Sequence, residues 1–236
     1  MFQIETACLV IRIENRYDYV KNLCREYITE PDRPADITVS VSEQELRREM
    51  EKVSGDFLSD GYTEGVVIYE KISNALPAFD AFVMHSSVVS VDGQAYAFAA
   101  ESGTGKTTHT RYWKEVLGDR LTVINGDKPI CRFKGEDLLA YGTPWCGKEN
   151  WQTKTSVPLR ALCLLERGEE NAVFPVNAAE HVGEMMRHFY LPPGKVDLLK
   201  MMELIDRMAA LVPVYRLRCR DDTSAAEAAT AYFGIR

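Results

Sequence analysis

The chain has 236 residues, of which 46% are hydrophobic and 27% charged, a balance typical of a globular protein with one sizeable core and a smaller appended lobe. Its net charge of −7 argues against general binding to nucleic acid or to a membrane surface, because both partners are polyanions. The six cysteines form no C-x-x-C pair, so neither a zinc site nor a disulfide framework is indicated. With no apolar run of about 18 residues and no N-terminal signal, we expect a cytoplasmic protein.

The first 77 residues predict a small N-terminal α/β lobe. Apolar periodicity favours strands over residues 2–13 and 37–41, with a short helix over 15–26 between them. The segment from Ser42 to Glu45 reads as a helix start, and the helix would carry an apolar face made by Leu46, Met50, Val53 and Phe57. A further helix over 64–76 would end at Pro77. We expect this lobe to bind substrate or to mediate dimerisation rather than to catalyse.

The second predicted domain, residues 78–236, begins with strand-like runs over 82–89 and 94–99. The Asp92-Gly93 pair between these runs is a strong signal for a tight hairpin. We therefore expect residues 83–90 to pair antiparallel with residues 94–99. The sheet would then be mixed, unlike the doubly wound parallel sheets that commonly carry phosphate-binding loops.

A glycine-rich loop follows the second of these strands and leads into a helical stretch over 109–117. Backbone N–H groups of such a loop converge on phosphate oxygens, because glycine permits positive φ and a close approach. Lys106 would reach the β- and γ-phosphates, and the Thr107 hydroxyl would ligate Mg²⁺. We predict that ATP and Mg²⁺ bind to Ser102, Gly103, Thr104, Gly105, Lys106, Thr107 and Thr108.

Two observations bear on the assignment of this loop as a phosphate-binding loop, namely how often such a match arises by chance and where it departs from the consensus. A match of this kind arises by accident in roughly one chain in a hundred of this length, and the competing interpretation is a surface turn that caps a helix. Ala100 stands where the consensus has glycine. A methyl group is tolerable at that entrance to the loop if φ stays negative, so Ala100 bears on affinity more than on identity.

The remaining pattern continues to alternate strands and helices. A buried strand over 121–124 ends at Asn125-Gly126-Asp127, which places an acidic residue where Mg²⁺ or the proton of a nucleophile would be met. A hairpin over 130–133 and 138–141 leads to a second loop, 142–149. We expect strands over 159–166, 172–176 and 214–219, and helices over 178–190, 195–211 and 224–233.

The order of His85-Ser86-Ser87, hairpin, glycine-rich loop, strand and Gly126-Asp127 resembles the HPr kinase/phosphorylase and phosphoenolpyruvate carboxykinase superfamily. The loop is most similar to that of the carboxykinases. The chain length and the upstream histidine are more similar to HPr kinase and to small related kinases found with peptide-modification clusters. The motifs cover residues 82–166, and the succession of elements extends the likeness to residue 233. We therefore expect an α/β fold in which a P-loop core with a mixed sheet follows the N-terminal lobe.

The resemblance implies roles for several residues. Asp127 would be the catalytic base, a metal ligand or both, since HPr kinase has two aspartates where this chain has Gly126 and Asp127. His85 would assist that carboxylate, Glu149 would correspond to the family's second metal-binding glutamate and Lys154 would contact phosphate, with a structural or solvent-exposed role as the alternative for each. Residues 142–147 with Trp145 would line the acceptor pocket, and Lys148 lies beside them, although Trp145 could equally belong to the core.

These observations predict an ATP-dependent kinase that phosphorylates a hydroxyl acceptor, with Asp127, His85 and Lys106 as catalytic residues. The acceptor is a peptide or protein serine or a small alcohol, and the sequence does not separate them. A nucleotide-binding regulator without catalysis is the alternative favoured by Gly126 and Ala100. Carboxykinase activity is less favoured, because the chain is much shorter than that family's. A homo-oligomer is compatible with the sequence.

Overall fold

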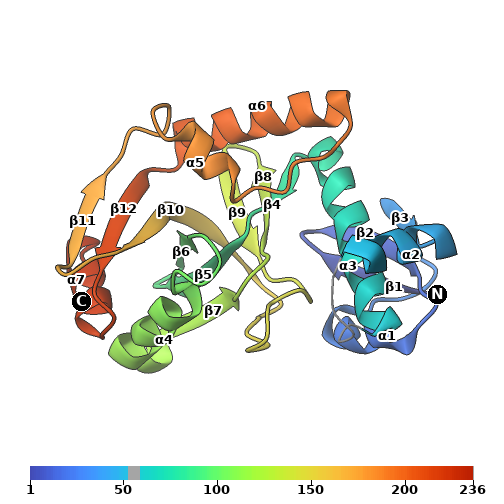
Figure 1. The fold of residues 1–236 in the computed structure, drawn as a ribbon, viewed down its shortest axis with the longest axis horizontal. Helices are drawn as coiled ribbons and strands as arrows, with labels where there is room; N and C mark the ends of the chain where they lie inside the picture. Colours follow the sequence, from blue (N-terminus) through green and yellow to red (C-terminus); the bar gives the residue numbers. More distant parts are fainter. Residues whose placement is uncertain (53–58, 236) are drawn as a thin grey trace.

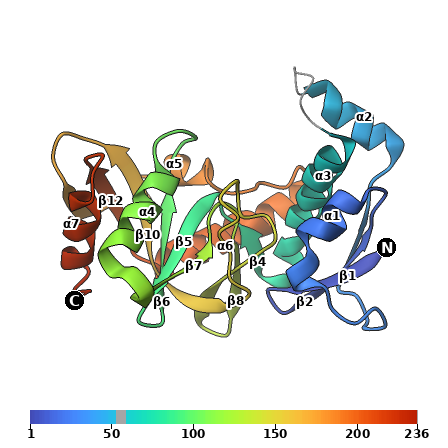
Figure 2. The ribbon, with the colours of Figure 1, turned by 90° about the horizontal axis from the view of Figure 1, so that it is seen from below.

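A computed structural model describes residues 1–52 and 59–235 of the chain (Figure 1). The N-terminal lobe lies beside the larger part of the molecule, and the two termini lie at opposite ends of the long axis (Figure 2). Val53 and Phe57, which the sequence assigned to an apolar helix face, lie outside the described residues.

The N-terminal lobe contains a three-stranded sheet of β1 (Phe2–Thr6), β2 (Leu9–Glu14) and β3 (Ile37–Ser40), in that order. The prediction of one strand over 2–13 is wrong, because Ala7 and Cys8 take φ of 52° and 55° and form a tight turn between antiparallel β1 and β2. The lobe's helical segments are α1 (Asp18–Leu23), η1 (Arg25–Tyr27), α2 (Glu43–Lys52) and α3 (Asp60–Ala75).

The predicted helix start at residues 42–45 is confirmed and is a capping box. Glu45 N donates to Ser42 Oγ at 3.3 Å, and Ser42 N donates to Glu45 Oε2 at 2.9 Å. The Glu45 carboxylate also pairs with Lys71 Nζ at 2.7 Å, which ties α2 to α3. A helix that the sequence placed over 64–76 begins earlier, at Asp60, because Ser59 Oγ accepts from Tyr62 N.

The second sheet has nine strands and is mixed. Its main path runs β4-β8-β9-β10-β6-β5-β7, and β12 pairs with both β10 and β11. The path strands are β4 (Ala81–Val83), β5 (Ser86–Val91), β6 (Gln94–Ala99), β7 (Leu121–Asn125), β8 (Ile130–Lys134), β9 (Asp137–Tyr141) and β10 (Ser156–Arg167). The other two are β11 (Ala172–Pro175) and β12 (Val214–Cys219). Because β10 is parallel to β6 and β12 whereas β5 is antiparallel to β6 and β7, the predicted α/β fold with a mixed sheet is confirmed.

The predicted Asp92-Gly93 hairpin is confirmed. Both residues have positive φ, 49° and 76°, and the strands that they join pair from Ser86↔Ala99 to Val91↔Gln94. The first strand is shorter than the sequence suggested, since Val83 pairs with Ile130 of β8 instead. Met84 and His85 therefore lie in a break between β4 and β5.

Helices cover both faces of this sheet (Figures 1 and 2). Ala95, Ala97 and Ala99 of β6 face the cluster that contains the apolar side of α6 (Lys195–Leu211). The alternate residues Tyr96 and Phe98 face the cluster of α4 (Lys106–Leu117) and α7 (Ser224–Tyr232). The two-residue period of the strand thus buries each face against a different helical layer.

The predicted helix over 178–190 is wrong except for α5 (Val182–Met186). Tyr190 N donates to Val83 O at 3.2 Å and His85 N donates to His188 O at 2.6 Å. Residues 188–190 thus satisfy their backbone groups against the break between β4 and β5 rather than in a helix. The helix predicted over 195–211 is α6, with the same bounds.

The division at residue 77 stays a prediction. One hydrophobic cluster includes Ile68 and Leu76 from before the division together with Val83, Tyr141 and Trp145 from after it. The link between the two parts is η2 (Leu76–Phe79), and a second short turn, η3 (Gly118–Arg120), connects α4 to β7. Among the described residues, no helix has both the length and the apolar character needed to cross a bilayer.

Candidate active site

Four strand ends meet at one edge of the large sheet. The pairs Ser86↔Ala99 and Val88↔Asn125 place the start of β5 beside the ends of β6 and β7. The parallel pair Leu164↔Ala99 brings the end of β10 to the same edge. Residues at or immediately beyond these ends therefore gather there, and they include His85, the glycine-rich loop, Asp127 and Arg167. Such an edge is where open α/β sheets bind ligands.

The predicted order of strand, glycine-rich loop and helix is confirmed, with β6 ending at Ala99 and α4 starting at Lys106. Gly103 and Gly105 have φ of +81° and +121°, and open space surrounds the position that a Cβ would take on either. The first N–H groups of α4 have no partner within the helix, and the positive end of its dipole lies here. The backbone at Ala100 has no positive φ, so its methyl group fits.

Lys106 points back along this loop, where its Nζ donates to Ala100 O at 3.0 Å. Burial lowers the pKa of Lys106, and the charge of Asp127 opposes that shift. The two groups are therefore close enough to interact electrostatically at the sheet edge.

Arg167, which the sequence analysis did not select, holds the outer side of the loop. Its Nη2 donates to Gly103 O at 2.8 Å and its Nε donates to Thr104 O at 3.1 Å. In a trans peptide the C=O and the following N–H point in opposite directions, so a carbonyl that is held toward Arg167 turns the next N–H away from it. Arg167 could have been identified only from the parallel register of β10 and β6, and no pattern in the sequence indicates that register.

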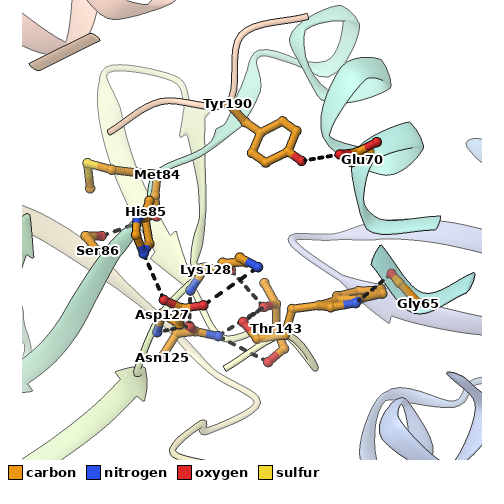
Figure 3. Close-up of polar contacts among 11 residues, drawn as sticks. Gly65, Glu70, Met84, His85, Ser86, Asn125, Asp127, Lys128, Thr143 and Tyr190 are labelled. Carbon is orange, nitrogen blue, oxygen red and sulfur yellow. Dashed lines mark hydrogen bonds and ion pairs between the residues drawn. The ribbon is translucent and has the colours of Figure 1, made fainter. Parts of the chain in front are cut away.

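Asn125 fixes the position of Asp127. The buried Asn125 Oδ1 accepts from Asp127 N at 2.9 Å and from Lys128 N at 2.7 Å, and its Nδ2 donates to Thr143 O and Oγ1 (Figure 3). This Asx-type turn ends β7 and directs the Asp127 side chain toward His85. From the sequence, Asn125 was predicted only to lie at the end of a strand, with no function.

His85 Nε2 lies 3.1 Å from Asp127 Oδ1, and Lys128 Nζ lies 3.8 Å from Oδ2 (Figure 3). Burial by itself would raise the pKa of Asp127. The hydrogen bond from His85 and the charges of Lys128, His85 and Lys106 outweigh burial and hold that pKa below its ordinary value. Asp127 is therefore an ionised carboxylate at neutral pH.

Gly126 has no room for a side chain. A Cβ at this position would lie 2.8 Å from Cys146 O and 3.5 Å from the Trp151 side chain. A backbone hydrogen bond from Gly126 N to Trp151 O, at 2.8 Å, holds the Gly126 and Trp151 segments at this close distance. A second carboxylate beside Asp127 is thus excluded by the backbone of the loop that packs against it.

A cavity of about 710 Å³ opens at this edge of the sheet. Of the predicted site residues, it is lined by His85, Ser102, Gly103, Gly105, Lys106, Thr107, Thr108, Asp127, Trp145, Lys148 and Glu149. Thr104 lies instead at a smaller recess on the other side of the loop. Lys154 lies outside the cavity, with its Nζ 5.7 Å from the centre of the Tyr27 ring, so we do not carry it into the function proposed for this site. Gly142 also lies outside, because its backbone packs against Thr153 O.

The N-terminal lobe, which was expected to bind substrate or to mediate dimerisation, supplies the other wall of this cavity, although the sequence named none of the residues that line it. Residues of α1 and α3 face it, namely Tyr19, Leu23, Tyr62, Gly65, Val66 and Tyr69. Tyr190, which follows α5, completes that wall.

The oxygen atoms near the loop suit a hard cation. A Thr hydroxyl and one or two carboxylates, supplemented by phosphate oxygens and water, form the usual Mg²⁺ shell in nucleotide sites. Thr107, Asp127 and Glu149 all line the cavity, and a Cβ on Gly147 would lie 3.8 Å from Asp127 Cγ and 3.9 Å from Glu149 Oε2. Across residues 1–52 and 59–235, no group of three or more His, Cys, Asp or Glu side chains is placed to hold a metal ion by itself. Thr107, Asp127 and Glu149 are oxygen donors of the kind that Mg²⁺ prefers.

No protein-family model and no curated protein matches this chain. Among solved structures, it is similar to the HPr(Ser) kinase/phosphatase from Coxiella burnetii, with a TM-score of 0.37 and 7% sequence identity over 64% of this chain and 95% of that one. At this level of similarity, no function passes from that enzyme to this chain.

Proposed function

We propose that this protein is a kinase that binds ATP with Mg²⁺ on residues 102–108 and transfers the γ-phosphoryl group to a hydroxyl acceptor. The observation that carries the proposal is that the ionised carboxylate of Asp127 faces the same cavity as the glycine-rich loop and Lys106. Phosphoryl transfer depends mainly on positioning and on charge neutralisation, and both are available here.

The loop would bind the nucleotide's phosphates. The N–H groups at the start of α4 and the Lys106 ammonium group would meet the phosphate oxygens, once Lys106 exchanges its Ala100 carbonyl for them. Thr107 and Asp127, with Glu149, would hold Mg²⁺, which neutralises charge on the phosphates when bound.

Asp127 would receive the acceptor's proton. In this step the acceptor oxygen forms a bond to the γ-phosphorus, the bond from that phosphorus to the β–γ bridging oxygen breaks, and the hydroxyl proton passes to Asp127. His85 holds the carboxylate of Asp127, and Asn125 accepts a hydrogen bond from the backbone N–H of Asp127. A weakly basic carboxylate suffices, because in a loose transition state the bond from the acceptor oxygen to phosphorus is little formed and the hydroxyl proton is lost late.

One observation favours a second candidate, a nucleotide-binding regulator without catalysis. Gly126 leaves no space for a second carboxylate, so metal binding and proton transfer would both fall to Asp127. A protein that only senses nucleotide would have no need of a separate base.

The test is transfer of labelled phosphate from ATP to candidate hydroxyl acceptors by wild type, Asp127→Asn and Asp119→Asn, the last a matched control on η3 outside the cavity. We expect Asp127→Asn to lower the transfer rate about 10²–10⁴-fold, as for loss of a general base, and Asp119→Asn to leave it unchanged. Retained Mg-ATP affinity in Asp127→Asn would assign Asp127 as the base. If wild type binds Mg-ATP yet phosphorylates neither acceptor nor water, the kinase proposal fails and the regulator replaces it.

A further inference from the structure

We infer that the N-terminal lobe, together with Trp145 and Tyr190 of the core, forms the acceptor subsite, which recognises an aromatic or large apolar group carried by the hydroxyl substrate. This inference rests on the proposed kinase function. The subsite is the aromatic wall of the cavity, defined as Tyr19, Tyr62, Tyr69, Trp145 and Tyr190.

The aromatic wall is attached to the Asp127 side of the cavity. Lys128 Nζ lies 5.2 Å from the centre of the Tyr69 ring and 3.8 Å from Asp127 Oδ2, so one cation bridges the wall and the carboxylate. The Tyr69 and Trp145 rings are 5.0 Å apart. Trp145 Nε1 donates to Gly65 O at 3.3 Å, which joins the second loop of the core to α3.

The in-line geometry of phosphoryl transfer indicates that the acceptor, and not the nucleoside, contacts the aromatic wall. In phosphoryl transfer the attacking and leaving oxygens lie roughly in line on opposite sides of the phosphorus atom. The glycine-rich loop and Lys106 take the leaving side, so the acceptor approaches past Asp127. The groups next to the acceptor hydroxyl then meet the aromatic wall, whereas the nucleoside extends away from it.

Two tyrosines are held out at the mouth of the cavity. Tyr19 and Tyr62 keep 41% and 42% of their surface exposed, and their rings meet edge to face with centroids 6.0 Å apart. A Cβ at Gly61 would lie 2.7 Å from Tyr19 Cβ, and one at Gly65 would lie 3.5 Å from the Tyr19 ring. Glycine is unfavourable inside a helix, so these two in α3 are explained by the close approach of α1 that sets the Tyr19 ring in place.

The chemistry of the wall favours a flat or apolar group over a polyhydroxyl one. Tyr190 Oη already donates to Glu70 Oε1 at 3.1 Å (Figure 3), and the Trp145 indole N–H is bonded to Gly65 O. The Tyr69 hydroxyl is fully buried. Tyr69 and Trp145 are buried and support the wall from behind, so the ring surface that can bind aromatic and aliphatic groups, by stacking and by burial of apolar area, comes mainly from Tyr19 and Tyr62.

The subsite can be tested by binding, without turnover. The probes are N-acetyl-phenylalaninol against N-acetyl-alaninol, two primary alcohols that differ by a phenyl group, and N-acetyl-seryl-phenylalanine amide against N-acetyl-seryl-alanine amide. Each is titrated into the full chain with Mg²⁺ and a non-hydrolysable ATP analogue, with glucose as the polyhydroxyl comparison. We expect the phenyl member of a pair to bind about tenfold more tightly. The alcohol and peptide pairs distinguish a small substrate from a peptide.

Three variants assign the effect to the wall. Tyr62→Ala removes the phenyl preference, Tyr62→Phe keeps it, and Tyr232→Ala, which removes a similarly exposed tyrosine on α7, leaves it unchanged. Mg-ATP affinity, measured in the same samples, stays at its wild-type value in Tyr62→Ala. Equal binding of the phenyl and methyl probes overturns the inference. An equal loss of Mg-ATP affinity in Tyr62→Ala also overturns it, because the wall would then hold the nucleoside base.

Phosphoryl transfer is scored separately, so that the two proposals fail in different ways. A phenyl preference without transfer to any probe supports the subsite and contradicts the kinase activity. Transfer that ignores the phenyl group supports the kinase activity and contradicts the subsite.

Discussion

The two sides of the cavity are built differently. The phosphate side consists of residues of one loop, 102–108 without Thr104, that follow one strand, with Asp127 and Arg167 added from neighbouring strand ends. The aromatic wall gathers single side chains from α1, α3, the 142–149 loop and the segment after α5. Backbone groups bind phosphate whichever protein carries them, whereas ring surfaces must be assembled for one ligand. Under the proposed function, the phosphate side would therefore set the reaction class and the aromatic wall would select the acceptor.

Apart from Asp127→Asn, the largest effect is expected on the phosphate side, at Lys106. Lys106→Ala should lower transfer to every acceptor by about 10²–10³-fold, since a preorganised positive charge on the transferring group is lost. The measurement is transfer of labelled phosphate to aromatic and non-aromatic acceptors. Lys114→Ala, on the same helix but outside the cavity, is the control. A loss confined to aromatic acceptors would contradict the separation of the two sides.

The free energy of unfolding should also depend on pH, because His109 is buried beneath the glycine-rich loop on the phosphate side. Burial lowers the pKa of His109 from 6.5 to about 4, and its Nε2 accepts from Trp113 Nε1 at 3.0 Å. The unfolded chain binds a proton below about pH 6.5 and the folded chain only below about pH 4. Protonation of His109 therefore does not lower the free energy of unfolding above pH 6.5. As the pH falls toward 4, that free energy decreases by about 3 kcal/mol.

Urea unfolding of wild type and His109→Gln between pH 7 and pH 4 measures this contribution, because glutamine can accept the Trp113 bond and does not titrate. The difference between the two free energies of unfolding should shrink as the pH falls. A pH-independent difference would show that His109 is not the group responsible.

Arg167 tests whether the loop's geometry depends on its outer clamp. Arg167→Gln should raise the KM for ATP about tenfold with a smaller change in kcat, because charged hydrogen bonds to two loop carbonyls are lost at an exposed position. Arg167→Lys should recover only part of the loss, since an ammonium group cannot reproduce the planar fork. If the glutamine variant, the lysine variant and wild type have the same KM for ATP and the same kcat, Arg167 has no role in the site.

The smallest effect is expected at the capping box of α2, which belongs to the N-terminal lobe but does not line the cavity. Ser42→Ala should lower the free energy of unfolding by about 1 kcal/mol, and Ser42→Thr should restore most of it. Mg-ATP affinity and acceptor preference should both stay unchanged. A changed acceptor preference would mean that the aromatic wall depends on the whole lobe rather than on the contact of α1 with α3.

Features with a local cause were predictable. The Asp92-Gly93 turn follows from two residues that accept positive φ, and α6 follows from a long apolar period with no breaker inside it. The turn at Ala7-Cys8 was missed because neither residue type favours positive φ, and the surrounding strands impose it. The helix expected over 178–190 was lost to backbone pairing with Val83 and His85, which lie about a hundred residues away in the chain.

By itself, the sequence determined the order of strand, glycine-rich loop and helix, because its steric and hydrogen-bonding requirements are met by neighbouring residues. Only the tertiary structure decided what stands around that loop. Sheet register brought Arg167 to its carbonyls, Asn125 turned Asp127 toward His85, and the packing of α1 on Gly61 and Gly65 set the aromatic wall opposite. The Arg167, His85 and α1–α3 contacts join residues far apart in the chain, so no local pattern encodes them, whereas the Asn125 turn is local and decides only the direction of Asp127.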